Sequence, residues 1–409
     1  MFTVSKEDAR RFFVNRQLLA PPRAVEGGPE GVMEVVRRLG SIQFDPIPVA
    51  GRNHDLVLHA RVAGYDPTWT DDLYERREIF EAFNKGLSLV SMSELPWFRG
   101  NFALNSRRVL EEHPDVAKRV LERIRAEAPL SVHDFERQRG SLVDWFGAPR
   151  NVVAAVLEAL TYTGAIGLAR RDGNRRYYDL IERLVPRDVL ARKIPLQEQM
   201  RHKMLSRFRA HGLLGVDGGG SGIFSALGTA KPDPRFPGYE GRTAVREKLV
   251  ADGELVVVTV EGVRGKRFVL RDEVELLQNP PEPAPAVAFV PPFDPVVWDR
   301  PLLGWLFDFE YVWELFFPPE KRRWGWYTLP IVFGARLVGR IEPRIDRDAE
   351  AVQVIGLWWE DWLKPRKAEG FVDAMREALA AYLRFARAHK LIWAPHLAAD
   401  KRRFGQSPG

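Results

Sequence analysis

Cysteine is absent from the 409-residue chain, and histidine is scarce, with eight scattered copies. The absence of cysteine excludes disulfides, thiol catalysis, and zinc or iron–sulfur sites with cysteine ligands. His54 and His59 lack the i, i+4 spacing of a metal-binding pair on one helix face. We therefore expect neither a metal nor another cofactor.

Long apolar runs are also missing. No uninterrupted stretch approaches the roughly 20 apolar residues that a membrane helix needs, and the opening residues, MFTVSKEDARRFF, contain no apolar signal core. We expect a cytoplasmic protein with no membrane partner. The hydrophobic share of 45% and the charged share of 28% are ordinary for globular proteins. The length suggests two to four domains.

Positive charge is in excess, with a formal net charge of +6 and a pI near 9.5. Basic proteins of this kind often bind polyanions, and nucleic acid is the leading candidate. The alternative is an ordinary solvated surface, because six charges are few for a chain of this length.

The N-terminal stretch predicts two helices followed by an extended segment. Ser5 is placed to cap the first helix, Pro29 suits the first turn of the second, and Gly40 suits its C-terminal cap. The segment Ile42-Gln43-Phe44-Asp45 comes next. Extended chain alternates sides, so Gln43 and Asp45 share one face and the two apolar residues share the other. The alternatives are a strand with a solvated polar face and a site that pairs an amide with a carboxylate.

The stretch from residue 53 to about residue 130 is expected to be mostly helical and irregular. Beyond it, Val152 to Leu160 form an amphipathic helix that Gly164 ends. Ala165–Arg170 and Arg175–Asp179 then read as strands around Asp172-Gly173-Asn174, a short hairpin turn. A helix followed by a hairpin with a basic tip is typical of a winged helix. The basic residues that we expect to contact DNA there are Arg170, Arg171, Arg175 and Arg176.

The same pattern recurs further along the chain. Leu160–Ile166 matches Leu249–Leu255, and each is followed by a strand, a glycine-containing turn and an aromatic strand. Helices are expected at Gln197–His211 and Thr243–Val250. Between them, residues 215–241 are rich in glycine and proline. Because no Gly-Lys-Ser/Thr follows Gly218–Gly222, we expect a mobile surface loop and not a phosphate loop.

After a proline-rich stretch from Asn279 to Pro295, the pattern changes to strands. Trp326–Phe333 and Arg336–Ile341 predict a hairpin, Ala351–Trp359 predicts another strand, and a final helix is expected at about Lys367–His389. The predicted fold class is α+β, with about three tandem winged helices that scaffold a C-terminal β-rich domain. The expected domains are residues 1–130, 131–190, 191–278 and 279–409.

Several winged helices in one basic chain suggest duplex DNA as the partner. Three of them beside a β domain suit a concave clamp on one damaged site, most simply as a monomer. In such a clamp a carboxylate stabilises an oxocarbenium-like transition state and activates water, while an amide orients that water. Two alternatives stay open: a non-catalytic DNA-binding regulator, and a winged-helix module whose partners are proteins.

Four boxes, in order, resemble those of the winged-helix DNA glycosylases of the YcaQ (AlkX) group, which are related to the AlkZ group. They are Gln43-Phe44-Asp45, Arg52-Asn53-His54-Asp55-Leu56, residues Pro292 to Arg300, and Gly325–Pro330 with Leu337–Arg340. The AlkZ group carries a second Gln in place of the Asp, and the 215–241 insertion departs from the family pattern. The resemblance implies monofunctional excision of N7-alkylated purines and unhooking of interstrand crosslinks. It also implies that Asp45 is the catalytic carboxylate and Gln43 its partner.

The remaining candidates have two interpretations each. His54 lines the site or is structural, Arg52 is a further candidate for binding substrate or DNA, and Arg300 pairs with a carboxylate or contacts phosphate. Arg336 reaches a DNA groove or is an ordinary hairpin residue. Trp298 belongs to the core or is a stacking platform, and Lys321, Arg322 and Arg323 lie in a solvated loop or contact DNA.

Overall fold

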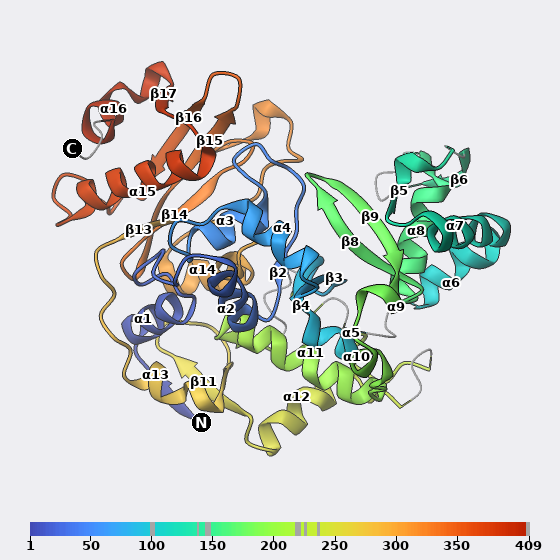
Figure 1. Ribbon diagram of the computed structural model, residues 1–409. Helices are drawn as coiled ribbons and strands as arrows, with labels where there is room; N and C mark the ends of the chain where they lie inside the picture. Colours follow the sequence, from blue (N-terminus) through green and yellow to red (C-terminus); the bar gives the residue numbers. More distant parts are fainter. Residues whose placement is uncertain are drawn as a thin grey trace.

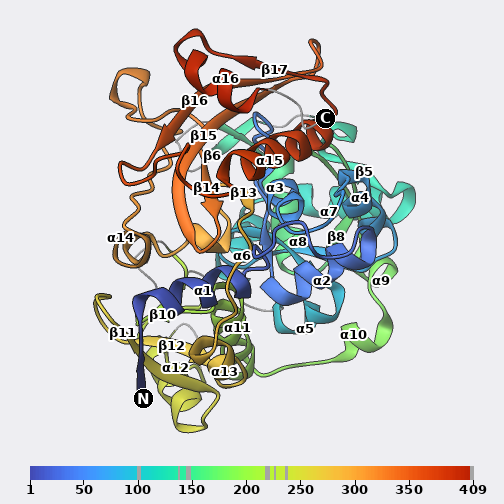
Figure 2. The ribbon, with the colours of Figure 1, turned by 90° about the vertical axis from the view of Figure 1, so that its left-hand side faces the viewer.

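The computed structural model describes residues 1–98, 103–136, 139–143, 149–216, 222–224, 227–234 and 238–405. Within them the chain has a mixed α+β fold, as the sequence predicts. Figure 1 shows an N-terminal unit in blue at the centre, with a second unit to one side. A third unit lies below it and a β domain above it, and Figure 2 gives the same vertical order. Among the described residues, no helix combines the length and apolarity required to cross a bilayer.

The N-terminal unit begins as the sequence predicts. The Ser5 side chain accepts a hydrogen bond from the backbone N–H of Asp8, and Gly40 adopts the left-handed conformation at the second helix end, with φ of 70°. Its elements are α1 (Lys6–Arg16), α2 (Pro29–Leu39), β2 (Ile42–Gln43), α3 (Asn53–His59), α4 (Pro67–Glu75), β3 (Ile79–Phe83), β4 (Leu87–Ser91) and α5 (Leu95–Phe98).

One prediction for this region is wrong. Residues 79–91 form a β-hairpin, where the sequence had suggested helical and irregular chain. The alternation in Ile79–Phe83 is imperfect, because both Ile79 and Phe80 are buried. The turn Asn84-Lys85-Gly86 was the stronger signal. The hairpin matters because β4 is the strand that pairs with β2.

In the second unit, the predicted helix and both strands of the hairpin are confirmed, with Gly164 at φ of 75° after the helix. The sheet order is β5-β9-β8. The elements are α6 (Ala103–Glu112), α7 (Pro114–Glu127), β5 (Leu130–Ser131), β6 (Arg139–Val143), β7 (Pro149–Asn151), α8 (Val152–Tyr162), β8 (Ile166–Asp172), β9 (Arg175–Leu180), α9 (Ile181–Leu184) and α10 (Arg187–Ala191).

The third unit confirms the two predicted helices and the strands after them. Its sheet has the order β1-β11-β12-β10, because the first strand of the chain joins it in parallel with β11. The elements are β1 (Phe2–Val4), α11 (Leu196–His211), β10 (Leu214–Gly215), α12 (Arg242–Ala251), β11 (Leu255–Val260), β12 (Arg267–Leu270) and α13 (Val274–Gln278).

The segment 215–241 is not a surface loop throughout. Ile223, Leu227 and Tyr239 are buried in the core of the third unit. Apolar side chains spaced between the glycines therefore anchor the segment, and composition alone concealed them. Of the glycine run, residues 218–221 lie outside the described residues, and only Gly222 is described.

The β domain has the sheet order β13-β14-β15-β16-β17, and α15 packs against it (Figure 1). The predicted hairpin, the third strand and the long helix are confirmed, with shorter bounds for the helix. Helix α14, strand β17 and the last helix were not anticipated. The elements are β13 (Val287–Phe289), α14 (Arg300–Phe307), β14 (Leu329–Phe333), β15 (Arg336–Asp346), β16 (Ala351–Trp359), α15 (Phe371–Ala386), β17 (Lys390–Trp393) and α16 (Ala398–Phe404).

A buried ion pair joins the N-terminal unit to the β domain. The Arg61 guanidinium, just after α3, donates two hydrogen bonds of 2.8 and 2.9 Å to the Asp294 carboxylate, and both side chains are fully buried. Arg61 also donates to the backbone carbonyls of Gln17 and Val57. Asp294 in turn accepts from the N–H of Val296. Each charge is thus both paired and hydrogen-bonded, which is the condition for burying it.

Replacing Asp294 with Ala is expected to lower the free energy of unfolding by about 3–5 kcal/mol, because it leaves the Arg61 charge buried without its partner. Equilibrium unfolding in urea measures this difference. Asp72→Ala is the matched control, since Asp72 forms a half-exposed pair with Arg76 on α4 and its loss is expected to cost at most about 1 kcal/mol. Equal losses in both variants would contradict the role of the buried pair.

Candidate active site

The segment that carries Gln43 and Asp45 is held as the edge strand of a small sheet. Ile42 and Gln43 pair with Leu89 and Ser88 of β4, and the Phe44 N–H donates to the Leu87 carbonyl at 2.7 Å. Ile42 and Phe44 are buried, whereas Gln43 and Asp45 are partly exposed. The predicted alternation of faces is therefore confirmed.

The Asp45 carboxylate has an unusual environment for an acidic side chain. Its Oδ1 accepts one hydrogen bond, from the N–H of Ile47 at 2.9 Å, and no cationic group of the described residues lies within 4 Å. Partial burial raises the pKa of Asp45 above its usual value, and the hydrogen bond from Ile47 opposes that rise. The carboxylate is thus partly desolvated, reachable by solvent and not neutralised by an ion pair.

Tyr327 from the β domain lies near this carboxylate. Burial raises the pKa of Tyr327 well above its ordinary value, and the negative charge of Asp45 adds to the rise. The phenol is fully buried, and its oxygen has no hydrogen-bond partner among the described residues. A neutral O–H group without a partner therefore sits close to the Asp45 side of the site.

The Gln43 side chain faces the turn between β3 and β4. The Lys85 ammonium lies 3.5 Å from the Gln43 Oε1, and it also lies over the rings of Phe293 and Trp298, at 5.9 and 5.3 Å from their centroids. Burial, together with the nearby positive charges of Arg207 and Arg300, lowers the pKa of Lys85 to about 8. The turn thus places an ammonium group with a lowered pKa beside the Gln43 amide.

Gly86 completes this turn at close range. A methyl group on its Cα would lie 2.9 Å from the Gln43 Nε2 and 3.1 Å from its Cδ. The turn is itself fixed, because the Asn84 N–H donates to the Gly86 carbonyl and the Ser88 hydroxyl donates to the same oxygen. The space around the Gln43 amide is therefore set by a glycine.

Asn53 clamps the backbone of the segment. Its amide Nδ2 donates to the Gln43 carbonyl at 2.7 Å, and its Oδ1 accepts from the Phe293 N–H at 3.1 Å. Asn53 is fully buried. The Asn53 side chain thus connects the strand that contains Gln43 to the box that contains Phe293. Phe293 lies 240 residues after Asn53 in the chain.

The residues after Asp45 lead directly into two other parts of the molecule. The Val49 carbonyl accepts from the N–H of Ile345 in β15, and the Ala50 carbonyl accepts from the Tyr382 phenol of α15. The tip of the β8–β9 hairpin also reaches this segment, because the Asn174 amide donates to the Pro46 carbonyl at 3.1 Å. Gln43 and Asp45 therefore lie where the N-terminal unit, the second unit and the β domain meet.

His54 and Arg52 lie behind the site. His54 is buried, stacks on the Phe44 ring at 4.6 Å, and is 3.5 Å from Asp55. Burial lowers the pKa of His54 to about 4, so it is neutral at physiological pH. Arg52 pairs with Asp55 at 2.6 Å and is largely covered. His54 therefore supports the ring of Phe44, next to Asp45, whereas Arg52 is held by Asp55 and the Gly173 carbonyl.

The four arginines of the β8–β9 hairpin separate into two kinds. Arg171 is buried in an ion pair with Glu81 of β3 and packs on the Phe44 ring, 3.8 Å from its centroid. Its guanidinium is therefore part of the interface between units and does not lie on the surface. Arg170 stacks on Tyr177, Arg175 is exposed and Arg176 is partly exposed, so these three remain available to a polyanion.

Arg300 is exposed beside Tyr311 and forms no ion pair with a described residue. It contributes to the positive potential at Lys85. Arg336 lies 4.0 Å from Glu7 of α1 and over the Trp362 ring, so its contacts are not shared with Asp45 or Gln43.

Trp298 is buried, and its indole N–H donates to the Phe293 carbonyl, which places it in the core. Lys321 and Arg323 are exposed and Arg322 is partly exposed. The three side chains therefore lie at the surface as expected, and their contact with DNA stays a prediction.

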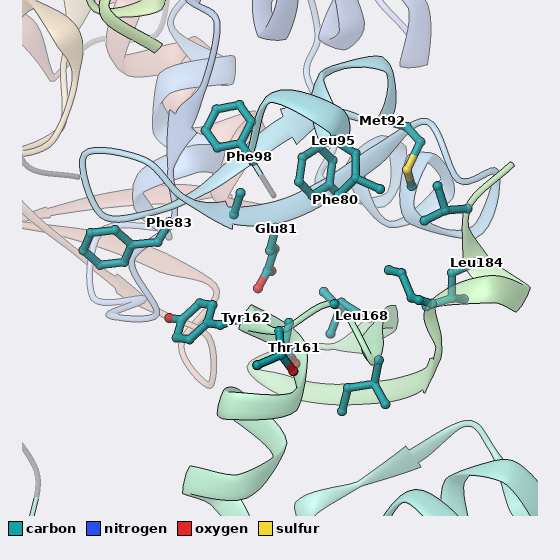
Figure 3. Close-up of a pocket in the computed structure, with 17 residues that line it drawn as sticks. Phe80, Glu81, Phe83, Met92, Leu95, Phe98, Thr161, Tyr162, Leu168 and Leu184 are labelled. Atoms are coloured by element: carbon teal, nitrogen blue, oxygen red, sulfur yellow. The ribbon is translucent and has the colours of Figure 1, made fainter. Parts of the chain in front are cut away.

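An apolar cavity lies away from this site, between the N-terminal and second units (Figure 3). Phe80, Phe98 and Met92 line one side and Tyr162, Leu168 and Leu184 the other, with Glu81 between them. The Glu81 carboxylate accepts hydrogen bonds from Arg171 and Tyr74. It therefore offers no unpaired oxygen to the cavity. Among the described residues, no group of three His, Cys, Asp or Glu side chains is arranged to hold a metal ion.

Sequence reasoning missed Asn53, Lys85 and Tyr327 as neighbours of the pair. Asn53 and Tyr327 lie inside the boxes singled out in the sequence, but no local pattern showed that both approach residues 43–45. Lys85 was missed because the hairpin that presents it was not predicted.

Comparison with known proteins places the chain in a recognised group. A family model described as "DNA glycosylase AlkZ-like" matches residues 36–385. Among solved structures, Streptomyces sahachiroi DNA glycosylase AlkZ has a similar fold, with a TM-score of 0.61 and 18% sequence identity. That similarity covers 96% of this chain and 99% of the other.

Buried neutral histidines predict how stability depends on pH. The unfolded chain binds a proton at His54 near pH 6.5, whereas the folded chain does so only near pH 4. The contribution of His54 is therefore complete above pH 6.5 and is lost as pH falls toward 4. We expect the free energy of unfolding to decline over this range, and His54→Leu to decline less steeply in urea titrations at each pH. His59 and His211, with similarly lowered pKa values, retain the rest of the slope. Identical slopes would contradict the assignment.

Proposed function

The chain belongs to the AlkZ-like DNA glycosylase family, and from this premise we propose which bond it breaks and how. The proposed reaction is hydrolysis of the N-glycosidic bond of cationic, N7-alkylated purines in duplex DNA, without strand cleavage by the enzyme itself. Unhooking of interstrand crosslinks formed through the same ring nitrogen is the same chemistry on a larger adduct. A protein that repairs chromosomal DNA would act in the cytoplasm, at the nucleoid.

The observation that carries this proposal is the state of Asp45. Its carboxylate is partly exposed, lies two residues from Gln43, and has no ion pair with a described residue. As the bond to the base lengthens, positive charge develops on the sugar, and a fixed carboxylate stabilises it most when water is partly excluded. The same carboxylate accepts the proton of the attacking water.

Gln43 is proposed to hold that water. An amide offers a donor and an acceptor at once. The Lys85 ammonium lies near the Gln43 oxygen, while no described residue accepts a hydrogen bond from its Nε2. The amide nitrogen therefore remains available to a water or to the substrate, and Asn53 fixes the backbone from which it projects.

The base that leaves is proposed to be cationic in the substrate, because such a base departs without an acid catalyst. A purine alkylated at N7 already carries a positive charge and departs as a neutral base. The site then needs only a carboxylate and an oriented water.

The contacts with DNA are proposed to come from three winged helices. In the described residues, the sheets β2-β4-β3, β5-β9-β8 and β10-β12-β11 share one order: the first strand pairs with the third, and the third with the second. Each ends in a hairpin, and this order supports the winged-helix interpretation for all three. Arg170, Arg175 and Arg176 are the proposed phosphate contacts of the second wing, and one copy of the chain is proposed to hold one lesion.

Asp45→Asn is expected to lower the rate of base excision by about 10²–10⁴-fold, because it removes both the negative charge and the proton acceptor. The assay incubates the protein with duplex DNA containing N7-methylguanine, cleaves abasic sites with hot alkali, and counts strand breaks. Binding of the duplex should persist, since asparagine still accepts the Ile47 hydrogen bond. Asp373→Asn, on the exposed side of α15, is the control. Undiminished cleavage by Asp45→Asn would move the chemistry elsewhere, and no cleavage by the native protein would favour a DNA-binding regulator.

Gly86→Ala tests the placement of Gln43. The added methyl group would displace the Gln43 amide, and the backbone at Gly86 is not in the left-handed region. We expect kcat to fall about 10-fold with the unfolding midpoint nearly unchanged, since a modest misplacement of a positioning group lowers the rate strongly. Gly304→Ala is the matched control, because a methyl group there meets no atom within 4 Å. An unaltered kcat in Gly86→Ala would show that Gln43 does not orient the water.

A further inference from the structure

Two consecutive phenylalanines project from the β domain into solvent. Phe316 is 65% exposed and Phe317 is 43% exposed. The other large apolar side chains that are exposed in the described residues, such as Trp362 and Ile392, stand apart from one another along the chain. A contiguous exposed aromatic pair is a feature of surfaces that bind a partner.

The segment that carries them lies between α14 and β14, contains one 3-10 turn (Pro319–Lys321), and is held by hydrogen bonds on both sides of its tip. The buried Glu314 carboxylate accepts hydrogen bonds from the N–H groups of Arg323, Trp324 and Gly325, at 2.8 to 3.1 Å. On the other side of the tip, the Arg322 guanidinium donates to the Phe317 carbonyl at 2.8 Å. These hydrogen bonds fix the backbone on both sides of the two rings.

A series of ring contacts connects the tip to the candidate active site. Phe316 packs edge-on against Trp313 at 5.4 Å between centroids, and Trp313 packs in the same way against Phe293 at 4.7 Å and Tyr327 at 6.5 Å. The charge of Asp45 contributes to the raised pKa of Tyr327, and the Phe293 N–H donates a hydrogen bond to Asn53. The exposed rings therefore lie at the outer end of a series of ring contacts that begins at the candidate active site.

The charge around the tip favours a polyanion. Pro318, Pro319 and the exposed Glu320 follow the two phenylalanines, and Lys321, Arg322 and Arg323 come next. Arg323 is paired with Glu310 at 2.7 Å, whereas Lys321 is exposed and forms no ion pair with a described residue. A second copy of this chain would bring Lys321 and Arg322 against the same cations, whereas DNA phosphates would neutralise them. Apolar rings beside phosphate-binding cations are the arrangement with which proteins part stacked bases.

We propose that Phe316 and Phe317 form a wedge that enters the base stack of duplex DNA beside the damaged nucleotide. This inference rests on the proposed function, since it assumes that the damaged nucleotide lies at Asp45. The wedge replaces the stacking that the neighbouring base pair loses with stacking on an aromatic ring. It thereby gives the carboxylate and its water access to the sugar. Trp313, which packs against both Phe316 and Tyr327, connects the wedge to the site.

The test uses binding, so that it does not depend on catalysis. A duplex carries 2-aminopurine next to a tetrahydrofuran abasic analogue, and its fluorescence rises when the neighbouring base is unstacked. We expect the native protein and Asp45→Asn to raise the fluorescence equally, and Phe316→Ala/Phe317→Ala to raise it by less than a third as much. Phe316→Leu, which keeps apolar bulk without an aromatic face, should fall between them. Ile392→Ala, an equally exposed apolar position on β17, is the control and should match the native protein.

Excision kinetics provide the second readout. The double variant should lose about 10-fold or more in kcat/KM on N7-methylguanine in duplex DNA, and about 3-fold or less on the same strand without its complement, where no stack must be opened. Equal losses on both substrates, or fluorescence like that of the native protein, would overturn the wedge. A native dimer that the double variant breaks in sedimentation would assign the pair to an interface between copies and would also overturn it. If the native protein excises nothing but still raises the fluorescence through these rings, the wedge stands and the proposed reaction falls.

Discussion

The geometry of the site depends on the buried pair between Arg61 and Asp294. It lies at the contact between the end of α3 and the box that precedes α14, and both charges are removed from water. Such a pair contributes little net stability compared with apolar side chains of the same size, but it tolerates only one relative placement of its two partners. The Asn53 clamp lies in the same contact, eight residues before Arg61 and next to Asp294 through Phe293. The placement that satisfies the ion pair therefore also fixes the backbone of Gln43.

The environment of Asp45 differs from that of the Arg61–Asp294 pair, because the charge of Asp45 is not compensated. The surrounding structure buries it partly and gives it a single hydrogen bond, so its pKa rises. A carboxylate in this state lowers folding stability at neutral pH, because the charged form is better solvated in the unfolded chain. Ion pairs satisfy its neighbours Asp55 and Glu81 fully. A partly buried carboxylate whose charge no ion pair compensates is a candidate for a functional group.

The sequence predicted most of the local structure and little of the assembly. Ser5, Gly40 and Gly164 marked helix ends because caps and left-handed turns depend on the residue itself, and the alternation at residues 42–45 depends only on the period of a strand. By contrast, nothing local showed that β1 would pair with β11, about 250 residues away, or that Val49 would bond to β15. Arg171 illustrates the same limit. Its place on a basic hairpin suggested DNA, but its partner Glu81 lies on the hairpin that the sequence did not reveal.

The cationic substrate of the proposed reaction has an electrostatic rationale in the site. The Lys85 ammonium already lies over the faces of Phe293 and Trp298, which shows that these rings are oriented to attract positive charge. Lys85 and the core cover the Trp298 face, so the proposed purine cation would be attracted mainly by the uncompensated carboxylate of Asp45. Lys85 would repel such a base while it is charged, and burial together with nearby positive charge lowers its pKa to about 8. A neutral purine would lack this attraction, so the proposed site would discriminate against undamaged DNA before any bond is broken.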